Sequence, residues 1–275
     1  MMIQLDRIYK YFRWLSLDIV LGAIFFLAYL ESYYEVSLSL HVYYALGSAV
    51  WLIYTTDHLM DGNAMENPSS DRHGFHKKYS NWLIVVGGVV LIIALVNVYF
   101  LEVEIIRNGA ILSAVSIGYL LLVYFFRKLW VKELLVAIVY ASGIFIGPLS
   151  MRSEVSVLDI ILLLQLSGVA LLNLLVFSFY DREADQKDGF NSLVLRIGEG
   201  KSRLLILLCS FLVITTCVLL GLSNQIQCVF LLMTLILTVI FLFPQAFGQK
   251  ALYRTIGDGI FYLPGLFLLL EPKFF

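Results

Sequence analysis

Two pairs of aspartates are the residues in this sequence whose types and spacing are best suited to chemistry. The pairs Asp57–Asp61 and Asp181–Asp185 each follow a long apolar run and have a four-residue spacing. Side chains four residues apart lie on one face of a helix, so each pair presents two carboxylates together. Carboxylates gathered at a membrane surface are costly unless a positive group joins them. A divalent metal ion that carries an anionic substrate is the natural candidate.

Charged residues near the two pairs extend this interpretation to a phosphate-bearing substrate. Asp188 lies one further helical turn beyond the second pair, with Lys187 and Arg196 close by, and Arg72 and Lys77 follow the first pair. Oxygen ligands of this kind suit Mg²⁺, which completes its shell with water and phosphate oxygens. We therefore predict two acidic faces that hold Mg²⁺ and clamp a diphosphate, so that it is stabilised as a leaving group.

The elements that must position these residues are membrane helices. The chain has 275 residues, of which 60% are hydrophobic and only 14% are charged. A soluble domain carries about a quarter charged residues. The apolar residues form long runs, which are typical of helices rather than of a membrane β-barrel. We therefore predict an all-α, polytopic membrane protein.

Nine apolar segments approach the roughly 20 residues that a helix needs to cross a bilayer. The last segment is short and contains Asp258. We predict nine transmembrane helices over residues 14–34, 39–60, 80–101, 108–126, 133–151, 157–180, 204–221, 226–246 and 255–270.

Basic residues predict the orientation of these helices. With the N-terminus in the cytoplasm, all of the 19 lysines and arginines except Arg107, Arg152 and Lys273 fall on the cytoplasmic side. This distribution follows the positive-inside rule. It places both aspartate pairs on the cytoplasmic face, after the second and sixth helices. We expect a single domain, residues 1–275, with two four-helix halves, a final helix, and motif loops at 57–79 and 181–203.

The second acidic cluster resembles a known motif. The UbiA superfamily of intramembrane prenyltransferases has a second aspartate-rich motif that is matched here by Asp181, Asp185, Gly189, Ser192, Leu193, Arg196 and Gly198. The family's first motif reads Asn-Asp-x-x-Asp-x-x-x-Asp. Its last two aspartates correspond to Asp57 and Asp61, whereas its Asn-Asp positions hold Ile53 and Tyr54. The resemblance implies a nine-helix fold with both motifs on the cytoplasmic side.

The resemblance also implies a reaction. In that family an isoprenoid diphosphate ionises with Mg²⁺, and an acceptor captures the allylic carbocation. The implied catalytic and metal-binding residues are Asp57, Asp61, Asp181 and Asp185, with Asp188 as a further metal ligand. Arg72 matches a family arginine, and Lys128 and Lys132 resemble a basic cluster that contacts diphosphate. The expected partners are a polyprenyl diphosphate, a lipophilic acceptor and membrane lipids, with no nucleic acid. The expected site opens to the cytoplasmic side of the inner membrane or its equivalent.

Alternative reactions remain open at the sequence level. The change to Ile53 and Tyr54 would leave fewer metal ligands or indicate a different reaction after ionisation. Some members of the superfamily act as terpene cyclases, which need aromatic walls around successive cations. Aromatic residues suited to such a cavity flank both clusters, although lipid-facing positions also favour them. The candidates for the cavity wall are Tyr54, Phe177 and Tyr180.

Other polar residues have two interpretations each. Asn173 in the sixth apolar segment either lines the cavity or makes an interhelical hydrogen bond. Asp18 and Asp258 either act in the site or pair with Arg13 and Arg254. For His58, His73 and His76 we expect solvation at the membrane interface.

A non-catalytic transporter is the rival outside enzymes. Transporters place ionisable residues near the middle of the bilayer, where helices are often broken. Here the carboxylates gather at one membrane face, which favours an enzyme.

Overall fold

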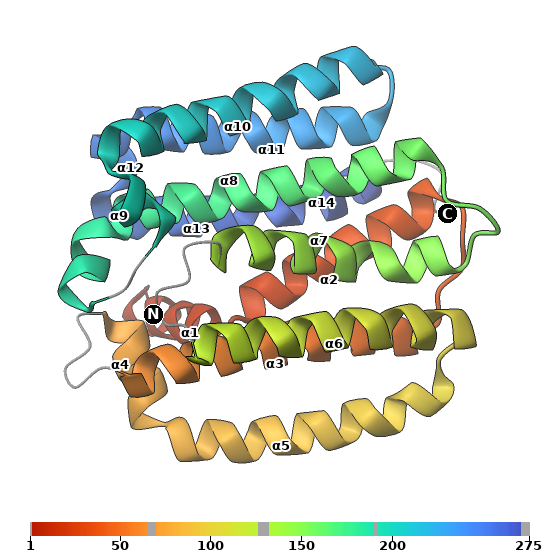
Figure 1. The fold of residues 1–275 in the computed structure, drawn as a ribbon, viewed down its shortest axis with the longest axis horizontal. Helices are drawn as coiled ribbons and strands as arrows, with labels where there is room; N and C mark the ends of the chain where they lie inside the picture. Colours follow the sequence, from red (N-terminus) through yellow and green to blue (C-terminus); the bar gives the residue numbers. More distant parts are fainter. Residues whose placement is uncertain (1, 65–69, 126–131, 190–191, 271–275) are drawn as a thin grey trace.

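The computed structural model describes residues 2–64, 70–125, 132–189 and 192–270. These residues form helices and short connections without any strand, which confirms the all-α prediction (Figure 1). The helices are α1 Met2–Trp14, α2 Leu17–Tyr33, α3 Leu40–Ala64, α4 Asp71–Lys78, α5 Ser80–Asn97, α6 Val103–Phe125, α7 Lys132–Ser150, α8 Val157–Lys187, α9 Leu193–Ile197, α10 Glu199–Leu220, α11 Gln225–Leu242, α12 Pro244–Phe247, α13 Leu252–Gly259 and α14 Leu263–Leu270, with 3₁₀ turns at Val98–Phe100, Gln249–Ala251 and Ile260–Tyr262.

Six of the described helices are long and apolar enough to cross a membrane: α5 with its 3₁₀ turn, α6, α7, α8, α10 and α11. The pair α1 and α2 adds a seventh if it counts as one span, bent by 71°. The bend coincides with Ser16, whose φ of 55° lies in the left-handed region and cannot continue a helix. The protein is therefore an integral membrane protein, and the nine-span topology and its orientation stay predictions.

Two predicted spans differ from a simple apolar helix. α3 has 25 residues, but tyrosine, threonine, histidine and aspartate side chains interrupt its apolar sequence. The last segment is divided into α13, a 3₁₀ turn and α14. Pro264 is the second residue of α14, a position that tolerates proline because the first N–H groups of a helix have no partner within it.

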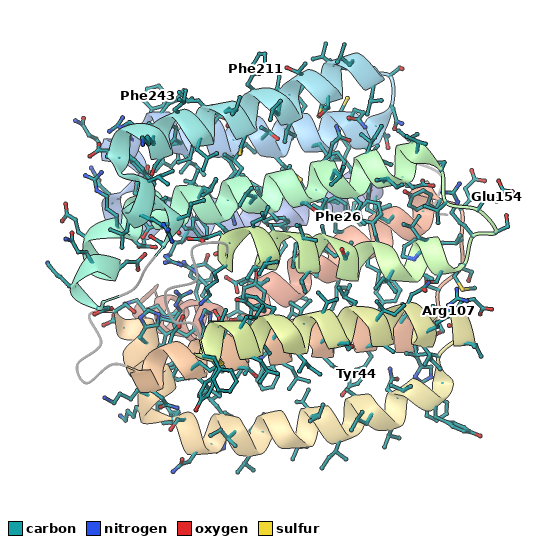
Figure 2. The ribbon with its side chains drawn as sticks, in the orientation of Figure 1. Phe26, Tyr44, Arg107, Glu154, Phe211 and Phe243 are labelled. Atoms are coloured by element: carbon teal, nitrogen blue, oxygen red, sulfur yellow. The ribbon has the colours of Figure 1, made fainter. Side chains whose placement is uncertain are left out.

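The long helices lie roughly side by side, with α8 between α7 and the α10–α11 pair (Figure 1). In α8, 61% of the most apolar 18-residue stretch is buried, compared with 11% in α5. Figure 2 shows the same gradient in single side chains, from Phe26 in the interior to Phe211 on the periphery. Phe26 is 0% exposed and Phe211 is 63% exposed. Lipid is the solvent that accommodates such apolar outer faces.

The short helices α1, α4, α9 and α12 gather at one end of the bundle, where α13 also lies (Figure 1). A hydrogen bond of 3.2 Å from Arg13 to Thr255 joins α1 to α13 at this end. The opposite end is fixed by the start of α8, where Ser156 and Asp159 form a capping box. Arg152 also pairs with Asp159 at 2.7 Å. From this anchored start α8 runs 31 residues as one helix and carries Asp181 and Asp185 to the end where the short helices gather.

Candidate active site

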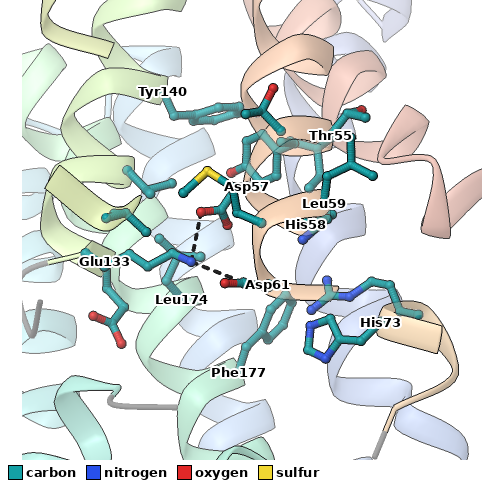
Figure 3. A pocket seen from close by; sticks show the side chains of 18 of the residues that line it. Thr55, Asp57, His58, Leu59, Asp61, His73, Glu133, Tyr140, Leu174 and Phe177 are labelled. Carbon is teal, nitrogen blue, oxygen red and sulfur yellow. Dashed lines mark hydrogen bonds and ion pairs between the residues drawn. The ribbon is translucent and has the colours of Figure 1, made fainter. Parts of the chain in front are cut away.

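The first acidic cluster is held by a cation from another helix. Asp57 and Asp61 both lie within α3, so their four-residue spacing places them on one face. The ammonium of Lys132, the first residue of α7, is 2.8 Å from Asp57 Oδ1 and 3.3 Å from Asp61 Oδ2 (Figure 3). Tyr119 of α6 donates its hydroxyl to Asp57 at 3.3 Å. One lysine thus bridges both carboxylates.

The second acidic cluster is held by α13. Asp181 accepts hydrogen bonds from the Tyr253 hydroxyl and the Arg254 guanidinium. The guanidinium carbon of Arg254 also lies 5.2 Å from the centre of the Phe177 ring, within the range of a cation–π contact. α13 approaches α8 closely at Gly257, where a Cβ atom would lie 2.6 Å from the Phe177 ring and 2.7 Å from the Asn173 amide oxygen. Only glycine fits at this crossing.

Both clusters face one cavity of about 890 Å³. Its charged wall consists of Asp57, Asp61, Arg72, Lys132, Glu133, Asp181, Asp185, Asp188, Arg254 and Asp258. Its apolar wall includes Leu52, Leu83, Ile84, Leu91, Val136, Ala137, Leu174 and Phe261. A cavity of this size, apolar with a few convergent polar groups, is the usual form of a small-molecule site.

Most of the residues predicted from sequence are on this wall. The residues in question are Asp57, Asp61, Arg72, Lys132, Asp181, Asp185, Asp188, Tyr54, Asn173 and Phe177. Asn173 therefore faces the cavity, and its amide oxygen has no hydrogen-bond partner among the described residues.

Four other predicted residues that the structure describes lie outside the wall. Lys77, Lys187 and Arg196 occupy exposed positions. Tyr180 donates its hydroxyl to the Ile240 carbonyl at 2.7 Å and stacks on Tyr253 with ring centres 4.2 Å apart. Its role is thus to support Tyr253, which in turn bonds Asp181. Lys128 lies outside the described residues.

The remaining residues of the second motif shape the chain after α8. Gly189 and Gly198 have φ values of 75° and 80°, which glycine adopts without strain. Ser192 caps α9 by accepting the N–H of Leu195 at 3.3 Å. The Leu193 N–H donates to the Glu133 carboxylate at 3.0 Å, which ties this segment to α7. These residues position the loop rather than supply charge to the cavity.

The expectation of solvated histidines is wrong. His58, His73 and His76 are only 6%, 7% and 1% exposed, because α4 packs across the end of α3. His76 donates its Nδ1–H to the Arg72 carbonyl at 2.9 Å. Burial, with the nearby Arg72 charge, lowers the pKa of His73 to about 4, and burial also lowers the pKa of His76. Both imidazoles of α4 are therefore neutral at pH 7.

Arg72 keeps its charge in this setting. Burial lowers the pKa of its guanidinium to about 10, and the nearby Arg254 charge acts in the same direction. At pH 7 the side chain remains protonated and available to an anion in the cavity.

Arg254 was not predicted as a site residue, and it binds Asp181. Asp258, for which the sequence left open a role in the site or a pair with Arg254, lines the cavity. Their charges at four-residue spacing in an apolar segment were the available signal. The alternative of a structural pair applies to Asp18, whose carboxylate lies 3.8 Å from Arg13. Glu133 and Tyr119 had no signal, since single polar residues at the start or middle of an apolar helix are common.

The acidic residues of the cavity fit a divalent cation. One ligand atom from each of Asp57, His58 and Asp61 lies within 4.8 Å of the others. Asp181, Asp185 and Asp188 add carboxylates to the same wall. Oxygen-rich donor sets of this kind suit Mg²⁺.

Comparisons with solved structures agree on the fold. A UbiA homologue from Archaeoglobus fulgidus bound to GPP and Mg²⁺ has a TM-score of 0.67 and 14% identity, covering 95% of this chain and 100% of that one. An apo UbiA homologue from Aeropyrum pernix K1 has a TM-score of 0.65 and 12% identity, with 94% and 99% covered. A digeranylgeranylglyceryl phosphate synthase has a TM-score of 0.57 and 15% identity, with 95% and 99% covered. No curated protein sequence matches significantly.

The sequence model of the UbiA prenyltransferase family matches residues 76–251. This range is more than half of the chain and contains the whole second motif, whereas Asp57 and Asp61 lie before it. The chain therefore belongs to the UbiA prenyltransferase family.

Proposed function

We propose that this protein is an intramembrane prenyltransferase that ionises a polyprenyl diphosphate with Mg²⁺ and transfers the prenyl group to a lipophilic acceptor. One observation carries the proposal: both acidic clusters and three basic side chains line a single cavity that is otherwise largely apolar. The diphosphate would occupy the charged end and the isoprenoid tail the apolar part. From the positive-inside distribution, the charged end opens to the cytoplasmic side.

The basic side chains would bind the diphosphate directly. Arg72, Lys132 and Arg254 all line the cavity, and two of them now neutralise aspartates. An incoming diphosphate offers oxygens that these donors bind with charge-assisted hydrogen bonds. Divalent cations held by Asp57 and Asp61 and by Asp181 and Asp185 would neutralise the charge that develops on the leaving group. The relative bound to GPP and Mg²⁺ supports this assignment.

The cavity wall also suits a prenyl cation. Tyr54, Tyr140, Phe177 and Phe261 line it, and aromatic faces stabilise a nearby positive charge. The apolar wall excludes water, which would otherwise capture the cation as an alcohol. A lipophilic acceptor that enters from the membrane can then react instead.

The proposal is tested with purified protein, Mg²⁺ and farnesyl or geranylgeranyl diphosphate, with and without a lipid extract as the acceptor source. We expect pyrophosphate release that depends on Mg²⁺, and a prenylated lipid detected by mass spectrometry. Replacement of Asp181 and Asp185 together by asparagine should lower both signals by about a thousandfold. Pyrophosphate release from that variant at close to the wild-type rate would contradict the proposal.

A terpene cyclase is the second candidate, and Tyr54 favours it. This residue replaces an aspartate of the usual first motif and lines the cavity with four other aromatic rings, those of Tyr124, Tyr140, Phe177 and Phe261. A cyclase needs no acceptor. Cyclic hydrocarbons or cyclic terpene alcohols formed from the diphosphate alone would establish cyclisation and refute prenyl transfer.

A further inference from the structure

His58 is the feature of the first cluster that a carboxylate-only Mg²⁺ site does not need. The residue is 6% exposed and lines the charged end of the cavity. Its Nδ1 atom has no hydrogen-bond partner among the described residues. A buried polar atom usually has a partner. The neighbouring ring of His76 lies 5.0 Å away, centre to centre, and its own Nδ1–H is engaged by the Arg72 carbonyl.

The helix geometry directs this imidazole toward the two aspartates. Asp57, His58 and Asp61 are consecutive or within one turn of α3, and Figure 3 shows the three side chains close together. One imidazole nitrogen and one oxygen from each carboxylate lie mutually within 4.8 Å. Bonds of about 2.0–2.2 Å to one cation require ligand atoms within about 4.4 Å of one another, so a small movement of these side chains lets all three bind the same ion.

We infer that Asp57, His58 and Asp61 form one cation site whose nitrogen ligand makes it prefer transition-metal divalent ions, such as Co²⁺ or Mn²⁺, to Mg²⁺. The inference rests on the proposed function, because it identifies the cation at the first cluster of the same cavity. Imidazole binds transition metals well, whereas Mg²⁺ selects oxygen ligands. The pair Asp181 and Asp185 offers carboxylate oxygens, so it keeps the ordinary preference for Mg²⁺. The histidine on that side, His73, lies beside Asp188, with its Nδ1 atom 3.8 Å from the Asp188 carboxylate.

Lys132 competes with a metal ion for this site. Its ammonium lies 2.8 Å and 3.3 Å from the two carboxylates. A cation bound there would displace the ammonium into the cavity by repulsion. The long lysine side chain allows this movement, and the released ammonium would be available to a phosphate oxygen. Metal binding and diphosphate binding would then support each other.

Pulsed electron paramagnetic resonance of Mn²⁺ bound to the purified protein, without diphosphate, tests the inference. At saturating Mn²⁺ we expect ¹⁴N modulation from a coordinated imidazole, which changes to a ¹⁵N pattern after labelling with ¹⁵N-histidine. The modulation should be absent in His58→Gln and unchanged in His76→Gln. Lack of histidine modulation in the wild type, or its persistence in His58→Gln, would overturn the inference.

A second variant guards against a failure to fold. His58→Asp replaces the nitrogen with an oxygen ligand, so it should bind Mn²⁺ without histidine modulation. By calorimetry we also expect the wild type to bind Co²⁺ at least about tenfold more tightly than Mg²⁺ at the first cluster. His58→Gln should lose about tenfold in Co²⁺ affinity and stay within twofold for Mg²⁺. Equal Co²⁺ affinities in the two proteins would refute the inference.

The outcome is separable from the proposed function. Histidine coordination without any diphosphate cleavage would sustain the metal site and refute the prenyltransferase. Mg²⁺-dependent cleavage of the diphosphate without histidine coordination would sustain the prenyltransferase and refute the metal site at His58.

Discussion

The two acidic clusters have the same spacing but are neutralised in different ways. In the first cluster the single ammonium of Lys132 bridges both carboxylates. In the second, Arg254 and Tyr253 hold only Asp181, and Asp185 remains on the cavity wall. The equivalent position of the two pairs in the sequence therefore does not give them equivalent chemistry.

The first cluster is neutralised by a lysine and the second by an arginine, and these two side chains differ in how firmly they are held. A lysine ammonium is a compact charge on a flexible stem, whereas an arginine guanidinium is planar and stacks on aromatic rings. Arg254 lies over Phe177 at 5.2 Å, so packing as well as charge fixes it. The first cluster can exchange its cation, and the second cluster is a preorganised part of the wall. Preorganised charge contributes most to the stabilisation of a transition state.

The largest effect should come from removal of either aspartate pair. Asp181→Asn with Asp185→Asn should lower the rate of pyrophosphate release by about a thousandfold, as expected for lost preorganised electrostatics. Asp57→Asn with Asp61→Asn should lower it by about a hundredfold, because Lys132 then remains free to bind phosphate oxygens. The control is Glu154→Gln, an exposed carboxylate at the other end of the bundle (Figure 2). Equal losses of rate in the two double variants would show that the two clusters contribute equally to pyrophosphate release.

The two cations should affect different kinetic constants. Lys132→Met should raise KM for the diphosphate about tenfold with little change in kcat, because the ammonium serves mainly in binding. Arg254→Met should lower kcat about a hundredfold, since Asp181 loses its buried partner. Steady-state kinetics with varied diphosphate separates the constants, and Lys132→Arg and Arg254→Lys are the conservative controls. If Lys132→Met and Arg254→Met both raised KM and left kcat unchanged, the two cations would act in the same way.

Some residues of the site could be predicted from the sequence, and others could not. Four-residue spacing and the positive-inside rule predicted that both pairs share one site, because these rules depend on local helix geometry and charge. The partner of Asp181 could not be predicted, because α13 lies 72 residues away in sequence from it. The burial of His58 was missed for a similar reason. It depends on α4 packing across α3, which apolar periodicity does not report.

A smaller effect should follow when the first cluster is made more like the second. Tyr54→Asp restores a carboxylate that the family motif has and adds an oxygen ligand to the cavity wall. The Mg²⁺ concentration for half-maximal activity should fall about tenfold, which corresponds to about 1.4 kcal/mol. Ile53→Asn is the matched control, since Ile53 lies beside Tyr54 but outside the described wall. An unchanged Mg²⁺ requirement in Tyr54→Asp would indicate that the lost aspartate position is no ligand in this fold.

The smallest effect is expected at two basic residues beside the second cluster. Lys187 and Arg196 are predicted diphosphate contacts, but both are exposed and outside the described wall. Lys187→Gln and Arg196→Gln should therefore each change KM for the diphosphate by less than about threefold, as for screened surface charges. A tenfold rise in KM would mean that these side chains contact the diphosphate when it is bound.

The close approach of Gly257 to α8 has a consequence for how the protein is made. Residues of α13 supply Arg254 and Asp258 to the cavity and are synthesised after all of the other residues on its charged wall. Chains are made from the N-terminus onward, and the earlier helices can assemble first. Until α13 reaches α8, Asp181 lacks its two hydrogen-bond donors and the cavity lacks one side. The docking of α13 onto α8 is therefore the late step of assembly that completes the charged wall of the cavity.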